Sequence, residues 1–526
     1  MDQENPLLFL ELIPGHRLTA RQKKLQAVIS WAVQGLSPIY RFRRIPTHIA
    51  DLKQNDRSTI AIWCSNNETL LSLNDHGSMG VKHCNVAIDQ MKVAIYGFSD
   101  AAIAETVSFV CSLTFSEDPS SLRIGSGDGR SNFNYATIAL APLLDANPPR
   151  NLDLQITNLT IEQSRDLATR PYPLNLNLNL KEFCFSFQDG GNAFVNALEH
   201  RTTPFGSLSM TLGNNVTPPG IHHNNVLRLF QMEKFDRLYV SNPDRDCVLP
   251  LLAAKVNGLE CYIHAKDIAP SDFDSLNIVA KDLNVKWNLS HAGNWSDILI
   301  AFFHRLATLC HVEKLAFSAA NWVAIHVFGH DAVAPVAAAL VRTIHSNPAL
   351  QHLELSHVPT IGLDWTSHMQ SIFQSLEEHP SIRTLIVSEV IPFRDTRTDE
   401  EREEYFSWLE HLLSRNHYLT VLDTSGQRVT NGSNIDKIYR DRYYHLAATK
   451  SAYQHFRHTV HLLSILHTDA LCQFMENVDP GGGVASQSVL ESEAQLPAPN
   501  SPTVFLKRKL TMQPSGDEAK KVRNES

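Results

Sequence analysis

Residues 346–358 read SNPALQHLELSHV, and residues 379–390 read HPSIRTLIVSEV. Both stretches contain a proline, then an apolar residue, then Leu-x-(Leu/Val) and a further valine at the same spacing. In the first stretch Leu353 and Leu355 flank Glu354, so the two leucines would share one face of a β-strand and the glutamate the other. The recurrence indicates a strand that the chain forms more than once.

Apolar pairs of this kind recur along most of the chain, on average about 30 residues apart. Each pair predicts a short strand whose two apolar side chains point into the core. The predicted pairs are Val93 and Ile95, Leu122 and Ile124, Leu152 and Leu154, Phe183 and Phe185, Leu208 and Met210, Leu238 and Val240, Leu259 and Cys261, Leu283 and Val285, Leu315 and Phe317, Leu353 and Leu355, Leu385 and Val387, and Leu419 and Leu422.

The segments between these pairs have apolar residues three or four apart, which predicts amphipathic helices. The clearest are residues 294–309, 331–348, 365–380 and 404–416. Several of them run into an Asn-Pro, His-Pro or Asp-Pro dipeptide just before the next strand. Proline cannot continue a helix, so it sets the point at which the chain passes from helix to strand.

A strand and a helix every 30 residues or so predict an α/β fold, namely a right-handed leucine-rich repeat solenoid. Its parallel sheet would form the concave face and its helices the convex face. An ordinary α/β domain built from unrelated strand–helix units is the alternative.

Six stretches carry a resemblance to known proteins: LAPLLDANPPRNLDLQ (140–155), LATRPYPLNL (167–176), AFVNALEHRTTPFGSL (193–208), DFDSLNIVAKDL (272–283), FQSLEEHPSIRTL (373–385) and WLEHLLSRNHYLTVLDTSGQRVTNGSNIDKIY (408–439). With them the sequence resembles leucine-rich repeat proteins of the ribonuclease-inhibitor type, and more closely the leucine-rich repeat families of microalgal genomes. The resemblance spans roughly residues 90–475 and implies a binding role without established chemistry.

The chain departs from the usual repeat pattern at the turns. The position three residues after the last inward-facing side chain is usually asparagine, whose side chain ties the turn together. Here that position holds Val358, Val390, Ala320, His264 and Thr157, and Asn288 only once. We therefore expect looser turns and a less regular curvature.

The predicted organisation has five parts. Residues 1–44 form a helical or flexible segment, 45–90 a β-rich N-terminal cap, 90–430 a solenoid of about 12 units, and 431–477 a helical C-terminal cap. Residues 478–526 are rich in Gly, Ser, Pro and Ala and predict a disordered tail. Two basic clusters in that tail resemble a bipartite nuclear localisation signal, the alternative being a solvated charged tail; they are Lys507, Arg508, Lys509, Lys520, Lys521 and Arg523.

Composition excludes several classes of function. The formal net charge of -9 disfavours direct binding to nucleic acid. The acidic N-terminus does not resemble a signal peptide, and the longest apolar stretch, residues 332–344, is too short to cross a membrane. Eight cysteines without a C-x-x-C pair predict buried thiols in an intracellular protein, cytoplasmic or nuclear.

No catalytic, metal-binding or cofactor-binding constellation is predicted. The sequence lacks H-E-x-x-H and G-x-S-x-G, and no Walker lysine follows the glycines of RIGSGDGRSN (123–132). His455, His458 and His461 cannot all share one face of a helix, so we expect them to be surface or cap residues. A non-enzymatic protein follows.

The residues between and beside the inward-facing pairs would lie on the concave face, where they would bind a protein partner. They are mixed in charge and include tyrosines, which suits a protein rather than a phosphate backbone. The predicted partner-binding residues are Asp153, Tyr239, Tyr262, Lys286, Lys314, His352, Glu354, His357, Thr384 and Ser388.

The leading hypothesis is therefore a non-enzymatic scaffold for protein–protein interaction. The main alternative is a substrate-recognition subunit of a ubiquitin ligase, in which residues 1–44 would dock an adaptor. A third is a GTPase-activating or other enzymatic role on a similar scaffold, which would need an exposed Arg or Asn beside a bound nucleotide.

Overall fold

The structure is a computed structural model. It describes residues 9–33, 38–52, 61–64, 66, 68–73, 82–89, 91–114, 121–125, 132–146, 148, 151–179, 185–212, 220–321, 330–355, 362–363, 365–387 and 399–442. The chain divides into two compact units, Met1–Leu446 and Ala447–Ser526. All described residues belong to the first unit, and the fold is that of this unit alone.

A 17-stranded sheet runs through the unit. Its first part is mostly antiparallel: only the pairing of β2 with β3 is parallel, and β6 lies between β4 and β5. Strand β5 then pairs antiparallel with β7, which begins the second part. The strands of the first part are β1 (Leu10–Leu12), β2 (Ile39–Phe42), β3 (Ala61–Trp63), β4 (Thr69–Leu73), β5 (His83–Ile88) and β6 (Met91–Gly97).

The second part of the sheet is entirely parallel, and its strands follow one another in chain order. They are β7 (Ser121–Gly125), β8 (Asn151–Gln155), β10 (Leu174–Asn177), β12 (Gly206–Thr211), β13 (Phe235–Ser241), β14 (Gly258–His264), β15 (Asp282–Asn288), β16 (Lys314–Ala320), β17 (His352–Leu355), β18 (Thr384–Val387) and β19 (Thr420–Leu422). A separate two-stranded sheet pairs β9 (Asn158–Leu159) with β11 (Ser186–Phe187). The predicted α/β class, with a large parallel-rich sheet, is confirmed.

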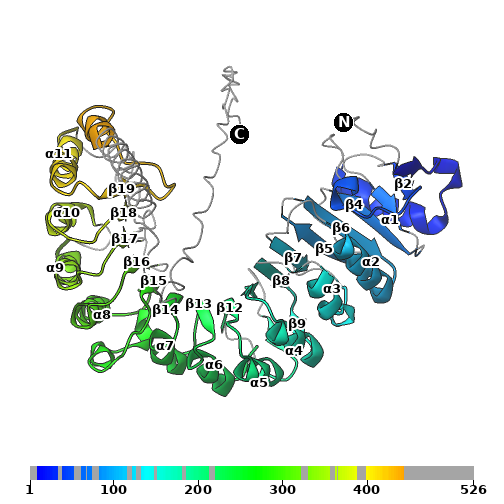
Figure 1. Cartoon of the computed structure of the whole chain (residues 1–526), viewed down its shortest axis with the longest axis horizontal. Helices are drawn as coiled ribbons and strands as arrows, with labels where there is room; N and C mark the ends of the chain where they lie inside the picture. The colour runs from blue at the N-terminus through cyan, green and yellow to red at the C-terminus, as the bar shows by residue number, and fades with distance from the viewer. Residues whose placement is uncertain are drawn as a thin grey trace, which may run out of the picture. The chain divides into compact units, whose positions relative to one another are not determined.

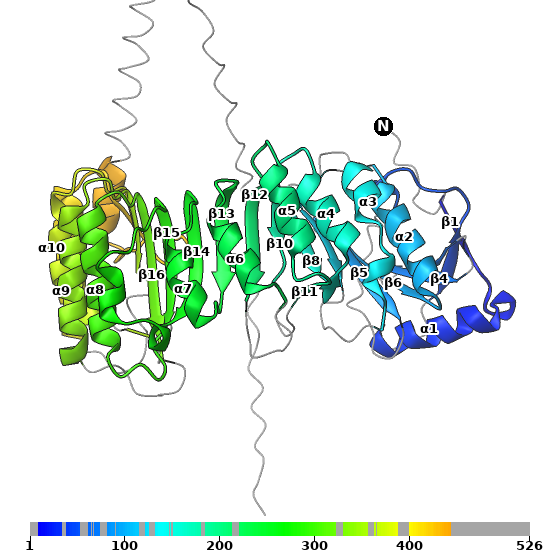
Figure 2. The ribbon, with the colours of Figure 1, turned by 90° about the horizontal axis from the view of Figure 1, so that it is seen from below.

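Helices α2 to α11 follow one another along one face of the sheet (Figures 1 and 2). The helices are α1 (Ala20–Val33), α2 (Asp100–Ser112), α3 (Leu140–Ala146), α4 (Ile161–Thr169), α5 (Asn192–His200), α6 (His223–Phe230), α7 (Arg245–Leu252), α8 (Trp295–Leu309), α9 (His330–Ser346), α10 (Met369–Glu377) and α11 (Asp399–Arg415). Short 3₁₀ turns are Gly15–Arg17, Ile49–Leu52, Tyr135–Thr137, Ala265–Asp267, Pro270–Phe273 and Thr366–His368. The predicted helices at 294–309, 331–348, 365–380 and 404–416 correspond to α8, α9, α10 and α11.

The parallel strands are held in one register. Each strand places an apolar residue directly beside that of the next strand; the row runs Leu122, Leu152, Leu176, Leu208, Leu238, Leu259, Leu283, Leu315, Leu353, Leu385 and Val421. All of these side chains are buried. Fully burying a leucine contributes roughly 1.5–3 kcal/mol, so this row and its second member two residues later supply much of the core.

Aromatic rings fill the space between sheet and helices. Phe194 on α5 stacks on Phe187 at 5.3 Å and meets Phe205 edge-on at 6.0 Å. Phe302 on α8 packs edge-on against Trp287 of β15, with ring centroids 5.5 Å apart. Edge-to-face and offset contacts of this kind are favourable beyond the apolar area that they bury.

Buried polar side chains at the helix ends connect successive strand–helix segments. The side chain of Asn347 donates from Nδ2 to the backbone carbonyl of Val312 (2.7 Å). The backbone carbonyl of Asn347 accepts from Nε2 of His379 (3.0 Å). Asn416 in turn donates to the carbonyl of Leu376 (2.9 Å). These three residues occupy equivalent places after α9, α10 and α11, and they satisfy carbonyls that the ends of helices and loops leave open.

The asparagine that was predicted to tie a turn is Asn288, which is buried and accepts from the backbone N–H of Ser290 (3.0 Å). The connection between segments through Asn347, His379 and Asn416 was not predicted. Val358 and Val390, which stand where the repeat pattern usually has an asparagine, lie outside the described residues.

Three of the predicted pairs do not have the predicted place in the parallel series, although Val93, Ile95 and Phe185 are buried in the core as predicted. Val93 and Ile95 lie in β6, which is antiparallel to both of its neighbours and not a member of the parallel series. Phe185 follows β10, and the residue in register with Leu152 and Leu208 is Leu176; Phe183 lies outside the described residues.

The last pair is displaced by one residue. Val421, not Leu422, lies beside Leu385 and is buried, while Leu422 is half-buried. The segment from Asn416 to Val421 is one residue shorter than the equivalent segment from His379 to Leu385. The spacing that places Leu385 correctly therefore leads to Leu422, one residue beyond the true position.

The N-terminal segment also differs from its prediction. Besides the predicted helix, α1, residues 9–44 supply strands β1 and β2, which pair with each other in the main sheet. At the other end residues 434–442 are helical. The rest of the predicted C-terminal cap, including His455, His458 and His461, lies outside the described residues, as do residues 478–526 with the basic clusters from Lys507 to Arg523.

Opposite faces of one strand give the first prediction. Leu353→Ala should lower the free energy of unfolding by about 2–5 kcal/mol, because it removes a fully buried side chain and leaves a cavity. Glu354→Ala, one residue along the strand, should change it by less than about 1 kcal/mol. Urea denaturation followed by circular dichroism measures both, and equal losses would contradict the assigned faces.

The second prediction concerns pH. Burial lowers the pKa of His379, as do the charges of Arg383 and His345, although its bonds to backbone carbonyls oppose the decrease. Nδ1 faces the N–H of Ile382 (3.1 Å), so the folded protein holds the neutral ring, protonated on Nε2. As the pH falls below about 6.5, the unfolded chain takes up a proton that the folded chain resists, and stability must fall.

The urea midpoint of the wild type should therefore decrease from pH 7.5 to pH 5.5. In His379→Asn, which keeps a donor for the Asn347 carbonyl, the decrease should be smaller. His200→Asn, a change at an exposed histidine, should leave the wild-type pH dependence intact. If the urea midpoint decreases equally with pH in both variants, His379 is not the group that causes the pH dependence of stability.

Candidate functional site

The face of the parallel sheet opposite the helices, here called the open face, carries every second side chain of β7 to β19. Most of those of β12 to β18 are half-buried or exposed, in alternation with the residues of the core. The exceptions are Gly258 and three residues at strand ends, Ser241, Asn288 and Ala320, which are buried. Because the strands are in register, these side chains form rows across the sheet. Two regions differ in chemistry: a charged region on β13 to β18 and an amide region on β8, β10 and β12.

Three rows build the charged region. The first is Arg237, Gly258, Asp282, Lys314, His352 and Thr384; the second is Tyr239, Glu260, Asn284, Ala316, Glu354 and Ile386; the third is Ser241, Tyr262, Lys286 and Ser318. On β16, Ala316 lies between the longer side chains of Asn284 and Glu354, and Ser318 lies beside Lys286. These two small side chains are therefore flanked by longer polar and charged residues.

Ion pairs connect strands in this region, either directly adjacent or across the intervening Gly258. Lys286 Nζ lies 2.6 Å from Glu260 Oε1. Asp282 is shared between Arg237, at 2.5 Å, and Lys314, at 3.8 Å. The three cationic side chains remain 43% (Lys286), 50% (Arg237) and 56% (Lys314) exposed, so each is accessible from the solvent side.

The charges of the region affect its titration. Burial lowers the pKa of Lys286, but the hydrogen bond and charge of Glu260, together with Tyr239 and Glu354, outweigh burial and raise it. Burial lowers the pKa of His352, and the charge of Lys314 adds to the decrease while Glu354 opposes it. At neutral pH the region therefore presents a charged Lys286 on β15 and, two strands away on β17, a neutral His352.

The structure brings most of the predicted partner-binding residues together. Seven of them lie on the open face in the charged region or at its edge: Tyr239, Tyr262, Lys286, Lys314, His352, Glu354 and Thr384. Asp153 lies on the same face in the amide region, where Arg123 Nε binds its Oδ2 at 2.5 Å. His357 and Ser388 lie outside the described residues.

Arg237, Glu260 and Asp282 belong to the charged region but were not predicted. Each occupies an outward position of a strand whose inward pair was correctly placed, so the alternation of the strand was the available signal. Their importance comes from pairing across strands, which a single sequence does not reveal.

The amide region was also missed. Asn175 Nδ2 donates to Asn151 Oδ1 (2.8 Å), and the hydroxyl of Ser207 donates to Asn175 Oδ1 (2.8 Å). Two residues further along the same strands, Asn177 Nδ2 donates to Asp153 Oδ1 (3.3 Å). A hollow of about 340 Å³ lies over these side chains. The alternating LNLNLN of residues 174–179 was the signal, but the register had been set on Phe183.

Possible metal ligands, thiols and apolar helices are the remaining features of the described part of the chain. Its residues contain no cluster of three or more His, Cys, Asp or Glu side chains arranged to hold a metal ion. The cysteines there are free thiols, and burial raises the pKa of Cys64 and Cys247 to about 11 and that of Cys84, Cys111 and Cys261 as well. None of the described helices has the length and apolar character needed to cross a membrane.

Comparison with known proteins does not assign the chain to a family: no family model matches the sequence, and no curated protein matches it either.

Proposed function

We propose that this protein is a non-enzymatic scaffold, a right-handed leucine-rich repeat solenoid of the ribonuclease-inhibitor type that binds another protein through its open face. The solenoid assignment is supported by the chain order of the parallel strands and by the helices that follow one another along the other face. Crossovers between parallel neighbours are right-handed in nearly all proteins, which supports the proposed hand.

The charged region carries the functional part of the proposal. It combines exposed cations, anions and two tyrosines on adjacent strands, each with a buried apolar residue next to it in its strand. Tyrosine and arginine are the residues most often found at the energetic centre of protein interfaces. A nucleic-acid groove would need one sign of charge, whereas cations and anions alternate here.

The mechanism of binding would be preorganisation. The side chains of the charged region stand on strands paired on both sides, and cross-strand ion pairs restrict several of them before a partner arrives. Little backbone entropy is then lost on binding, so more of the contact energy appears as affinity. The partner would present a complementary pattern of both charges rather than a uniformly acidic or basic surface.

Charge reversal at two positions tests the proposal. The double variant Lys314→Glu, Glu354→Lys keeps the net charge but inverts the pattern, so a protein captured by the wild type should be recovered at least about tenfold less. The matched control is Glu162→Lys, Arg165→Glu on the exposed surface of α4, which should leave recovery unchanged. Affinity capture with quantitative mass spectrometry measures recovery for all three proteins.

Thermal unfolding of the same proteins must show unchanged stability, since both reversed residues lie on the solvent side of their strands. Equal recovery by the wild type and the open-face variant would contradict binding through this face.

A further inference from the structure

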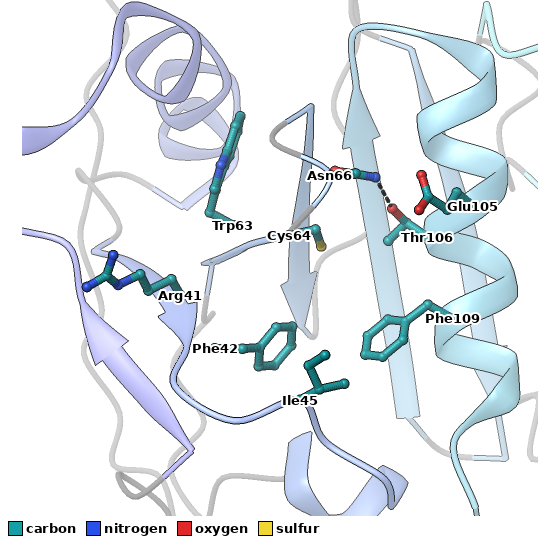
Figure 3. A pocket seen from close by; sticks show the side chains of 9 residues that line it. All are labelled: Arg41, Phe42, Ile45, Trp63, Cys64, Asn66, Glu105, Thr106 and Phe109. Carbon is teal, nitrogen blue, oxygen red and sulfur yellow. Dashed lines mark hydrogen bonds between the residues drawn. The ribbon is translucent and has the colours of Figure 1, made fainter.

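A second site lies away from the open face, between the end of β2, the residues that follow β3 and one side of α2. It is a pocket of about 300 Å³, at the small end of the range for ligand-binding cavities. Phe42, Ile45 and Phe109 converge on its centre, with Arg41 on one side and Glu105 on the other (Figure 3). The proposed function makes no use of this pocket.

The apolar wall of the pocket is unusually open to solvent. Ile45 is 65% exposed, although it lies beside the rings of Phe42 and Phe109, which are themselves only half-buried (Figure 3). The two rings meet edge-on with centroids 6.1 Å apart. An apolar group placed against these three side chains would recover the hydrophobic free energy that their exposure forfeits.

The polar side chains at the back of the pocket are already satisfied. Asn66 Nδ2 donates to Thr106 Oγ1 (3.0 Å) and to the carbonyl of Ala102 (3.2 Å). Thr69 is hydrogen-bonded to both Asn66 and Thr106. Burial raises the pKa of the Cys64 thiol to about 11, and the nearby carboxylate of Glu105 adds to the increase, so the thiol is neutral. These groups form a wall and do not need a ligand.

The charges at the mouth of the pocket do not balance. Arg41 is held by Glu11, whose Oε2 lies 3.0 Å from Nε and 2.8 Å from Nη2. Glu105 is exposed on α2, and no cationic side chain among the described residues pairs with it. One carboxylate therefore remains without a counter-charge beside an aromatic wall, and both features attract a cation.

We propose that this pocket binds a compact monocation with an apolar body, whose apolar part packs against Phe42, Ile45 and Phe109 and whose ammonium group faces Glu105. The charge of the ligand is assigned by Glu105 and its size by the volume of the pocket. Because the site shares no residue with the open face, loss of binding here and loss of partner capture are independent results.

Three probes of one shape test the assignment: phenethylamine, 2-phenylethanol and phenylacetate, which carry a positive, no and a negative charge. Saturation-transfer NMR with the full chain measures their binding. The amine should bind about threefold more tightly than the alcohol, as expected for an exposed charge pair, and the carboxylate should bind most weakly. Failure of all three probes to bind, or no preference for the amine, would overturn the proposal.

Two variants locate the binding. Glu105→Gln should abolish the preference for the amine over the alcohol, whereas Glu162→Gln, at an exposed glutamate on α4, should preserve it. Ile45→Ala should weaken both probes about threefold, and Val279→Ala, at another exposed apolar residue, should weaken neither. All four positions are solvent-exposed, so the variants should fold. Probe binding that is unchanged in Glu105→Gln and in Ile45→Ala would refute the site.

Discussion

The common register of the parallel strands is the constraint on which the rest of the structure depends. Side chains of a strand alternate between two faces, so a slip of one residue would carry every buried leucine to the solvent and every outward residue into the core. The row from Leu122 to Val421 prevents such a slip at each strand. The open face is therefore a direct consequence of the core: the residues available to a partner are fixed by the leucines beside them.

Register alone does not explain why successive helices keep their places, and the polar side chains at their ends supply the second connection. Asn347, His379 and Asn416 each tie their own segment to the one before through a buried carbonyl. Arg201 does the same earlier in the chain, where it donates to the carbonyls of Ala168 and Tyr172. Since an unmade bond at a buried carbonyl is costly, each segment stabilises its neighbour, and unfolding should spread along the array.

How far the sequence predicts this fold depends on how distinct each pattern is. Apolar pairs two residues apart identified the strands from β12 to β18 correctly. At β17 and β18 the turn signal agreed as well, because a proline ends the preceding helix. The strand predicted at Phe183 and Phe185 is wrong, because LNLNLN and the following FCFSF both alternate and the strand β10 lies in the first of them. The parallel strand predicted at Val93 and Ile95 is wrong as well, since side chains alternate between two faces in parallel and antiparallel strands alike.

The candidate site was predictable only as a face. Outward positions follow from alternation, so Tyr239, Lys286 and Glu354 could be placed on it from the sequence. Which of them act together depends on pairs across strands 24 or more residues apart, such as Lys286 with Glu260. The pocket beside α2 lay beyond prediction for the same reason, as Phe42 and Phe109 come from elements far apart in the chain.

The ion pairs of the open face bear on how charge and apolar burial would each contribute to the free energy of binding a partner. Each is half-exposed, and such pairs contribute at most about 1 kcal/mol because water screens them. A partner can therefore exchange them for its own charges at little cost, and Asp282, already shared by Arg237 and Lys314, can accept such a rearrangement. Charge would then select the partner and orient it, while the half-buried rings of Tyr239 and Tyr262 would supply most of the affinity by losing their remaining contact with water.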